Sequence, residues 1–174
     1  MIKLDTSENQ AKLIYLGIGS NLGNRKNNID KAKFKLSENN ISILRESKFY
    51  ETLSWPNKAK PKFINVVLLI KTRLSAHDLL KKCLSIEKKL GRKRIKKNEP
   101  RSCDIDIIDY DSKIIKKNSE NDLSVPHPRM HKRNFVLLPL FEISKSWVHP
   151  LKKTSIKDLI NSLKIEELRA IKIL

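Results

Sequence analysis

Two aspartates, Asp104 and Asp106, alternate with isoleucines in the stretch EPRSCDIDIIDYD, residues 99–111. Side chains alternate between the two faces of a β-strand, so both carboxylates are expected on one face, with Cα atoms roughly 6.5 to 7 Å apart. Carboxylates this close raise each other's pKa unless a cation neutralises them, and hard oxygen ligands favour Mg²⁺ or Mn²⁺. The spacing therefore indicates a divalent-metal site, with room for two ions. The pattern is short, however, and a solvated strand face is an alternative interpretation. Asp109 and Asp111 are expected at the strand end and the following turn, with no role beyond solvation.

Basic residues flank this acidic pair on its N-terminal side: Arg92, Lys93, Arg94, Lys96, Lys97 and Arg101. Mg²⁺ usually takes only one or two protein carboxylates, because phosphate oxygens and water complete its coordination shell. A metal pair beside a basic loop is typical of phosphoryl transfer, in which catalysis is largely positioning and charge neutralisation. Salt bridges that merely tether the loop would explain the charges but not the same-face spacing. The Walker phosphate-loop pattern and the protein-kinase motifs do not occur.

The composition is that of one intracellular domain with a strongly positive charge. A chain of 174 residues can bury a single core, and we expect one domain over 1–174, in which residues 1–12 form a short polar extension. Two cysteines, Cys83 and Cys103, are too few for a disulfide framework. Neither a leader-type apolar region nor a membrane-length apolar run occurs, so we expect a cytoplasmic monomer without membrane contact. The net charge of +18 favours a polyanionic partner, although lysines spread over solvated faces explain it equally well.

Hydrophobic periodicity places these residues on a mixed fold. Strands are predicted at Leu13 to Ile18, over ISILRESKFYET, over KFINVVLLIKTRL and over CDIDIIDYD. Helices are predicted at residues 24–38 and at 75–91, the second beginning with Ser75 and Asp78 in capping-box spacing. The first carries apolar residues at mostly helical spacing, Ile29, Ala32, Phe34 and Leu36. The resulting β-α-β-β-α-β order predicts an α+β, ferredoxin-like sandwich with helices on one face of an antiparallel sheet. The remainder, including VLLPLFEI and SIKDLINSLK, is expected to extend and cover the sheet edge as a C-terminal extension.

Five segments together resemble the 6-hydroxymethyl-7,8-dihydropterin pyrophosphokinase family of folate biosynthesis. They are LGIGSNLGNR, SKFYET, FINVVLLI, LGRKRIKKNEPRSCDIDIIDYD and VPHPRMHKRNFVLLPLFEI, and the resemblance runs from about Leu13 to Ile143. It implies an enzyme that moves the β,γ-pyrophosphoryl group of ATP to the hydroxymethyl oxygen of the pterin and releases AMP. ATP is then a cosubstrate, and no protein nucleophile is needed.

The resemblance also implies roles for individual residues. Asp104 and Asp106 would hold two Mg²⁺ ions, and Glu87 would orient other residues of the ATP site. The basic contacts to ATP map onto Arg92, Arg94, Arg101, His127 and Arg133, with Arg129 as a neighbour. Of these, Arg92 and Arg101 are expected to act with the aspartates in catalysis.

The pterin ring, in the same family, lies between two aromatic side chains and is read along its amide edge. Those roles fall on Phe63, Phe135, Asn65 and Thr52. Offset aromatic stacking adds roughly 0.5 to 1.5 kcal/mol beyond area burial, and a buried amide gives specificity. The chain departs from the family in its pterin loop, where Leu53-Ser54-Trp55 stands, and Trp55 is a candidate to cover the ring. It also departs at Lys97-Asn98-Glu99, where Glu99 adds a negative charge beside the expected ATP loop.

A function of a different class is a basic nucleic-acid-binding module that uses the same loop to contact phosphates. Such a module predicts steeply salt-dependent binding to DNA or RNA. Few aromatic residues are interleaved with the basic run, which argues against base stacking. We therefore expect small-molecule substrates and no nucleic-acid partner.

Overall fold

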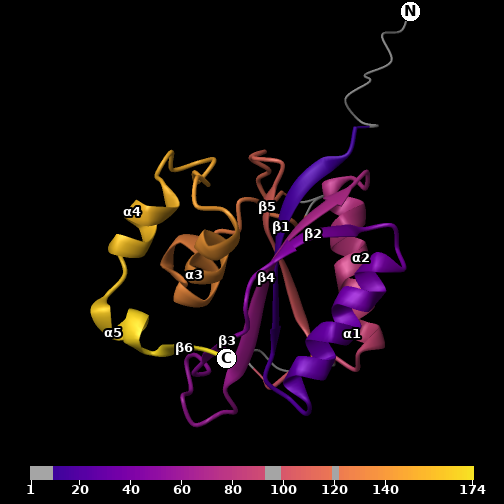
Figure 1. The fold of residues 1–174 in the computed structure, drawn as a ribbon. Helices are drawn as coiled ribbons and strands as arrows, with labels where there is room; N and C mark the ends of the chain where they lie inside the picture. Colours follow the sequence, from indigo (N-terminus) through magenta and orange to yellow (C-terminus); the bar gives the residue numbers. More distant parts are fainter. Residues whose placement is uncertain (1–9, 93–98, 119–121) are drawn as a thin grey trace, which may run out of the picture.

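The computed structural model describes residues 10–92, 99–118 and 122–174 of the chain, and Figure 1 shows their arrangement. The strands are β1 (Lys12–Ser20), β2 (Ser42–Glu46), β3 (Tyr50–Thr52), β4 (Phe63–Thr72), β5 (Asp104–Tyr110) and β6 (Ile171–Ile173). The α-helices are α1 (Arg25–Ser37), α2 (Ala76–Lys89), α3 (Asn134–Ile143), α4 (Ile156–Asn161) and α5 (Ile165–Arg169), with a 3₁₀ turn η2 at Met130–Lys132. The predicted α+β class and the order of the first elements are confirmed. None of the described helices is both long and apolar enough to cross a lipid bilayer.

The strands form one antiparallel sheet with the order β5-β1-β4-β3-β6. Strand β2 also pairs with β4, at residues 68–71, whereas β3 pairs with residues 63–65 of β4. Long β4 is central, as its almost continuous apolar sequence predicts, and pairs with β1 along nine residues from Lys12↔Thr72 to Ser20↔Ile64. The segment ISILRESKFYET, expected as one strand, is divided into β2 and β3. The pairing register shifts at this point, and Ser47 bonds the backbone of Val67 through its own N–H and through its side-chain oxygen. A residue inserted in this way is a bulge-like interruption that a periodicity pattern does not reveal.

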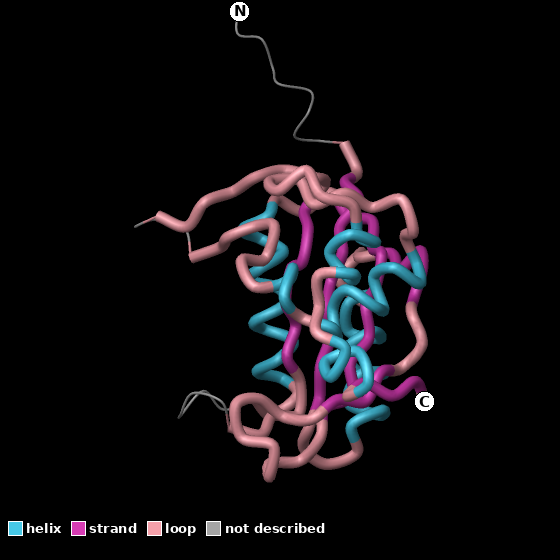
Figure 2. The backbone as a smooth tube through the Cα atoms, turned by 90° about the vertical axis from the view of Figure 1, so that its left-hand side faces the viewer, coloured by secondary structure: helices cyan, strands magenta, loops and turns pink. Residues whose placement is uncertain are grey.

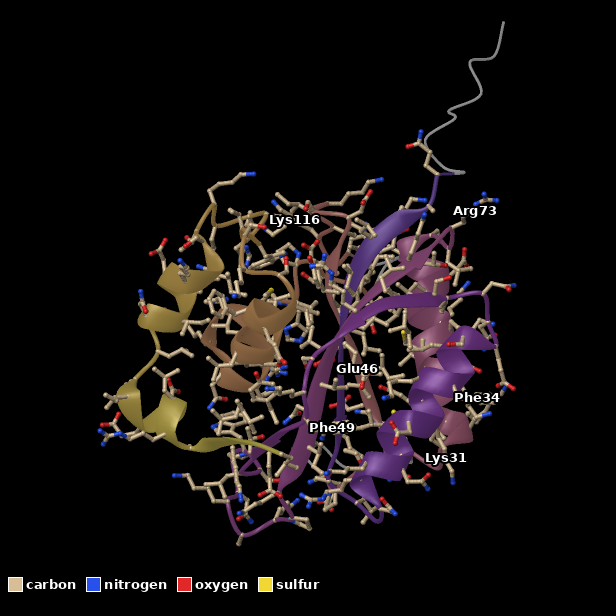
Figure 3. All side chains as sticks on the ribbon, in the orientation of Figure 1. Lys31, Phe34, Glu46, Phe49, Arg73 and Lys116 are labelled. Carbon is tan, nitrogen blue, oxygen red and sulfur yellow. The ribbon has the colours of Figure 1, made fainter. Side chains whose placement is uncertain are left out.

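Helices α1 and α2 cover one face of the sheet. Each begins at a side chain that accepts a backbone N–H, Asn24 for α1 and Ser75 for α2, so the predicted cap at Ser75 is confirmed. Their apolar sides bury β1 and β4 residues such as Leu16 and Leu68. Phe34 was expected on the inner side of α1 but is 64% exposed, and Figure 3 shows it on the outer side of the helix.

Helix α3 covers the opposite face, so the expectation of helices on one face only is wrong. Figure 1 shows α3, α4 and α5 on the side of the sheet away from α1 and α2, and Figure 2, turned so that this side faces the viewer, shows helices in front of the strands. Val67 and Ile108 project from the sheet into this second core, where they meet Leu137 and Leu140 of α3. The segment VLLPLFEI was expected at the sheet edge because a short apolar run has no periodicity that distinguishes a buried helix from a strand. The edge is in fact extended by β6, beside β3.

Asp109, which the sequence places at the strand end with no role beyond solvation, is buried in this second core. Its carboxylate accepts the indole N–H of Trp147 at 2.7 Å and the backbone N–H of Ser112 at 2.9 Å. Burial raises the pKa of Asp109, while these two hydrogen bonds act in the opposite direction. The solvated interpretation is therefore wrong for Asp109, because a residue far along the chain supplies its partner.

His149, which packs edge-on against Trp147, is expected to make the fold sensitive to acid. Burial, followed by the nearby His131 and Lys152, lowers the pKa of His149 to about 4. An unfolded histidine titrates near 6.5, so as the pH falls from about 6.5 to 4 the unfolded state gains a proton that the folded state does not. We expect the free energy of unfolding to fall by roughly 1 to 3 kcal/mol over this interval.

Urea unfolding between pH 7.5 and 4 measures this loss, and His149→Asn is the matched control. The backbone N–H groups of Leu151 and Lys152 donate to His149 Nδ1, a position that an asparagine oxygen can take without titrating. An equally steep loss of stability in the variant would exclude His149 as the responsible group.

Candidate active site

The sheet register gathers the candidate site on the face covered by α3. Ile105 and Ile107 enter the core beneath α1 and α2, so Asp104 and Asp106 project from the other face, as their spacing predicts. In the register Gly19 lies between Asp104 of β5 and Asn65 of β4. Residues that are 39 positions apart in the sequence are thereby separated by a single strand.

Two glycines of β1 form the floor between these groups, and sequence reasoning missed them. A Cβ atom at Gly19 would lie 3.0 Å from Asn65 Oδ1 and 3.5 Å from the Phe63 ring. Gly17, which is paired with Asp106, would place a Cβ 3.2 Å from the Ile108 side chain. The sequence does contain a signal for them, because Gly17 and Gly19 are two residues apart in an apolar strand and so lie on the same face. Glycines in such a strand indicate that neighbouring groups approach the backbone closely.

Asp104 lies between two guanidinium groups. Arg92 Nη1 is 2.5 Å from Oδ1 and Arg101 Nη2 is 2.5 Å from Oδ2. Burial alone would raise the pKa of Asp104, but the charges of Arg101 and Arg92 outweigh it and hold the pKa below its usual range. The carboxylate is therefore ionised at neutral pH.

Asp106 faces the segment between β5 and α3. Arg133 Nη1 donates to Asp106 Oδ2 at 3.2 Å, and His127 Nε2 lies 3.8 Å from the same oxygen. The backbone N–H of Arg129 donates to His127 Nδ1, so the neutral imidazole carries its proton on Nε2. Burial lowers the pKa of His127, with Arg133 and Arg129 acting in the same direction as burial and Asp106 against it. His127 is thus a neutral hydrogen-bond donor at pH 7.

Glu87 supports the acidic pair from beneath the sheet. This buried carboxylate on α2 accepts the backbone N–H of Ile105 at 2.8 Å, between the two aspartates, and pairs with Arg92 at 2.5 Å. Arg92 therefore joins Glu87 to Asp104. The arrangement agrees with an orienting role for Glu87.

An amide and two aromatic rings lie beside the carboxylates. Asn65 Nδ2 donates to Thr52 Oγ1 at 3.0 Å, and both side chains are buried. Phe63 lies under the Arg101 guanidinium at 4.9 Å and Phe135 under that of Arg133 at 5.4 Å. Each ring thus contacts a cation that also pairs with an aspartate. The four residues predicted for the pterin line the same face as the acidic pair.

The loop after β3 is fastened to the site by Asn21, another residue that sequence reasoning missed. The Asn21 side-chain N–H donates to Ser54 Oγ at 3.2 Å and to the Pro61 carbonyl at 3.1 Å. Its side-chain oxygen accepts the backbone N–H of Arg101 at 2.8 Å. Trp55, between these anchors, is 73% exposed.

Three predictions remain, two in the basic loop before β5 and one, Arg129, after β5. Arg94 lies outside the described residues. Glu99, which had no explanation in the sequence, pairs with Lys60 at 3.1 Å and links the segment before β5 to the loop after β3. The Arg129 side chain is exposed.

Carboxylates surrounded by arginines, next to a buried amide and two aromatic rings, define a class of site suited to phosphoryl transfer onto a small ring compound. The family profile described as 7,8-dihydro-6-hydroxymethylpterin-pyrophosphokinase (HPPK) matches residues 15–145. The chain is 40% identical over 145 residues to the 2-amino-4-hydroxy-6-hydroxymethyldihydropteridine pyrophosphokinase of Aquifex aeolicus, covering 83% of this chain and 88% of that protein. The chain belongs to the HPPK family.

Other relatives are longer proteins. The folic acid synthesis protein fol1 of Pneumocystis carinii is 43% identical over 156 residues, which cover 89% of this chain but 20% of that protein. A crystal structure of HPPK-DHPS from Plasmodium falciparum superposes with a TM-score of 0.72 at 16% identity, over 97% of this chain and 48% of that chain. This last likeness shows a shared fold.

Proposed function

We propose that this chain transfers the pyrophosphoryl group of ATP to the hydroxymethyl group of 6-hydroxymethyl-7,8-dihydropterin and releases AMP, as a step of folate biosynthesis. The observation that carries the proposal is the register Asn65, Gly19, Asp104 across three neighbouring strands. It puts a buried amide suited to a pterin edge beside an ionised carboxylate suited to a phosphate-bound metal. Family membership supports the same reaction.

The acidic pair would hold Mg²⁺, and the donor set fits this ion. Across the described ranges no group of three or more His, Cys, Asp and Glu side chains is arranged to hold a metal. The protein donors that we propose are Asp104 and Asp106. Mg²⁺ commonly takes one or two carboxylates and leaves its other positions to water and phosphate. Bound there, it would supply Lewis-acid polarisation of phosphate oxygens; two ions are our proposal for the triphosphate.

The basic side chains would bind the phosphates. Arg92, Arg101 and Arg133 are held beside the acidic pair by ion pairs. The Nε atom of Arg101 is buried and has no hydrogen-bond partner among the described residues, which leaves a donor for an oxyanion. His127 offers a further neutral donor. These groups would orient ATP and stabilise the negative charge that spreads over the transferred phosphoryl oxygens.

The amide of Asn65 and the hydroxyl of Thr52 would read the pterin edge, with Phe63 and Phe135 against the ring faces. Both rings are covered by guanidinium groups. Entry of the pterin would therefore require Arg101 and Arg133 to turn toward phosphate oxygens, which couples the binding of the two substrates. Closure of Trp55 over the ring, assignment of Arg94 to ATP, a single domain, a monomeric state and a cytoplasmic location stay predictions.

Incubation of the chain with ATP, Mg²⁺ and hydroxymethyl-dihydropterin tests the reaction. AMP and the pterin diphosphate are expected as products in equal amounts. Release of ADP would exclude pyrophosphoryl transfer, and binding of DNA or RNA that weakens steeply with salt, without AMP, would favour the nucleic-acid module instead.

Gly19→Ala is expected to weaken pterin binding more than it weakens the fold. The added Cβ meets Asn65 Oδ1 at 3.0 Å, so the amide must move away from the ring edge that it would read. We expect the KM for the pterin to rise about tenfold, while the KM for ATP changes by less than about threefold.

Steady-state kinetics with each substrate in turn measure this difference, and a thermal melt shows whether the fold is kept. Equal changes in both KM values would mean that Gly19 does not shape the pterin side of the site.

A further inference from the structure

The C-terminal segment 164–174 contacts two elements that carry residues proposed for the pterin, β3 with Thr52 and α3 with Phe135. On one side β6 pairs with β3, from Tyr50↔Ile173 to Thr52↔Ile171, and the backbone N–H of Leu174 donates to the Phe49 carbonyl at 3.0 Å. Strand β3, which carries Thr52, is only three residues long and lies between β4 and β6. Figure 1 shows this pairing beside the C-terminus. Half of the strand's backbone partners therefore come from the end of the chain.

On the other side the same segment holds the beginning of α3. The Asn134 side-chain N–H donates to the Glu167 carbonyl of α5 at 2.5 Å, and its oxygen accepts the Phe135 N–H at 2.7 Å. Asn134 stands between Arg133, which pairs with Asp106, and Phe135. The Glu167 backbone is itself fixed, because its side chain accepts the Lys164 N–H at 3.1 Å and its N–H donates to the Lys164 carbonyl at 3.0 Å.

The far end of α3 has an independent attachment to the same part of the sheet. Glu142 accepts the hydroxyl of Tyr50 at 2.9 Å and the backbone N–H of Lys48 at 3.0 Å. Helix α3 is thus fastened at its C-terminal end by Glu142 and at its N-terminal end by segment 164–174. A helix that is fixed at two points cannot swing about either, so the separation of Phe135 from Thr52 is set by both attachments.

We propose that segment 164–174 is a brace that sets the width of the pterin pocket, acting through β3 and Asn134 rather than by touching substrate. The proposal rests on the proposed function for the identity of the ligand, and on backbone pairing for the brace itself. The family profile ends at residue 145, so this element lies beyond the matched residues. It adds a positioning element to the pterin side, while the acidic pair, Arg92 and Arg101 lie on other elements.

Lys172→Pro removes the central pairing of the brace, and Lys172→Ala is the matched control. Lys172 is paired with Glu51 and its side chain is exposed. Hydrogen-bonded pairs alternate along an antiparallel ladder, so the bond at Leu174 places a second one at Lys172, whose N–H proline lacks. Alanine keeps that N–H. We expect Lys172→Pro to raise the KM for the pterin about tenfold and the KM for ATP by less, because Arg92 and Arg101 are not held by the brace, with Lys172→Ala close to wild type.

Hydrogen–deuterium exchange provides a readout that needs no ligand. Faster exchange is expected in Lys172→Pro both over residues 49–52 and at 133–136, although the latter make no pair with β6 in the described sheet. Unchanged exchange at 133–136, or equal changes in the two KM values, would overturn the brace. Failure of the wild-type chain to form AMP would instead overturn the proposed function, and the exchange experiment would still decide the brace.

Discussion

Replacement of Asp104 or Asp106 with alanine is expected to abolish AMP formation while the fold is kept. Each variant removes one hard oxygen donor and one negative charge from the proposed metal site. The expected loss of transition-state stabilisation is several kcal/mol. This corresponds to roughly 10³-fold or more in kcat. In β5 the alternation of aspartate and buried isoleucine runs from Asp104 to Ile107, and the Asp109 carboxylate farther along is already bound by Trp147.

Product formation under single-turnover conditions measures the loss, and circular dichroism verifies the fold. Asp104→Asn and Asp106→Asn keep the shape of each side chain without its charge, and they should be almost as inactive if metal binding is the role. Asp30→Ala is the matched control, because Asp30 is an exposed carboxylate of α1 on the opposite side of the sheet. Activity within tenfold of wild type in either alanine variant would rule out the metal assignment.

Strands and capped helices were predictable because local patterns determine them. The alternation Asp104, Ile105, Asp106, Ile107 requires that one face be polar and the other apolar, and the structure has this arrangement. The cap at Ser75 was equally local. The acidic pair could therefore be identified from its spacing before any tertiary contact was known.

Features that depend on which strands are neighbours could not be predicted from local patterns. The register that puts Gly19 between Asn65 and Asp104 is set by long-range pairing, so the open floor was missed. Asp109 was misjudged for the same reason, because its partner Trp147 is 38 positions away. The second helical layer was missed because the apolar segment that forms α3 shows no helical period.

Glu87→Ala is expected to destabilise the fold by about 3 kcal/mol, at the lower end of the range for breaking a buried ion pair. Two groups lose their acceptor: the Ile105 N–H, at 2.8 Å, and Arg92, at 2.5 Å. Arg92 keeps Asp104 and is partly exposed, which limits the loss. Urea unfolding measures the change in the free energy of unfolding.

Two further variants separate the causes of this loss. Glu87→Gln keeps an acceptor for the Ile105 N–H but removes the charge, so it should cost about half as much if the hydrogen bond and the ion pair contribute equally. Glu38→Ala removes an exposed acid whose pairing with Lys35 is long, at 3.9 Å, and should cost less than about 1 kcal/mol. A loss below about 1 kcal/mol for Glu87→Ala would mean that water or a rearranged Arg92 replaces the carboxylate. A loss near the expected value would instead show that α2 fixes the strand between the two aspartates, and so that the helix beneath the sheet determines the geometry of the site above it.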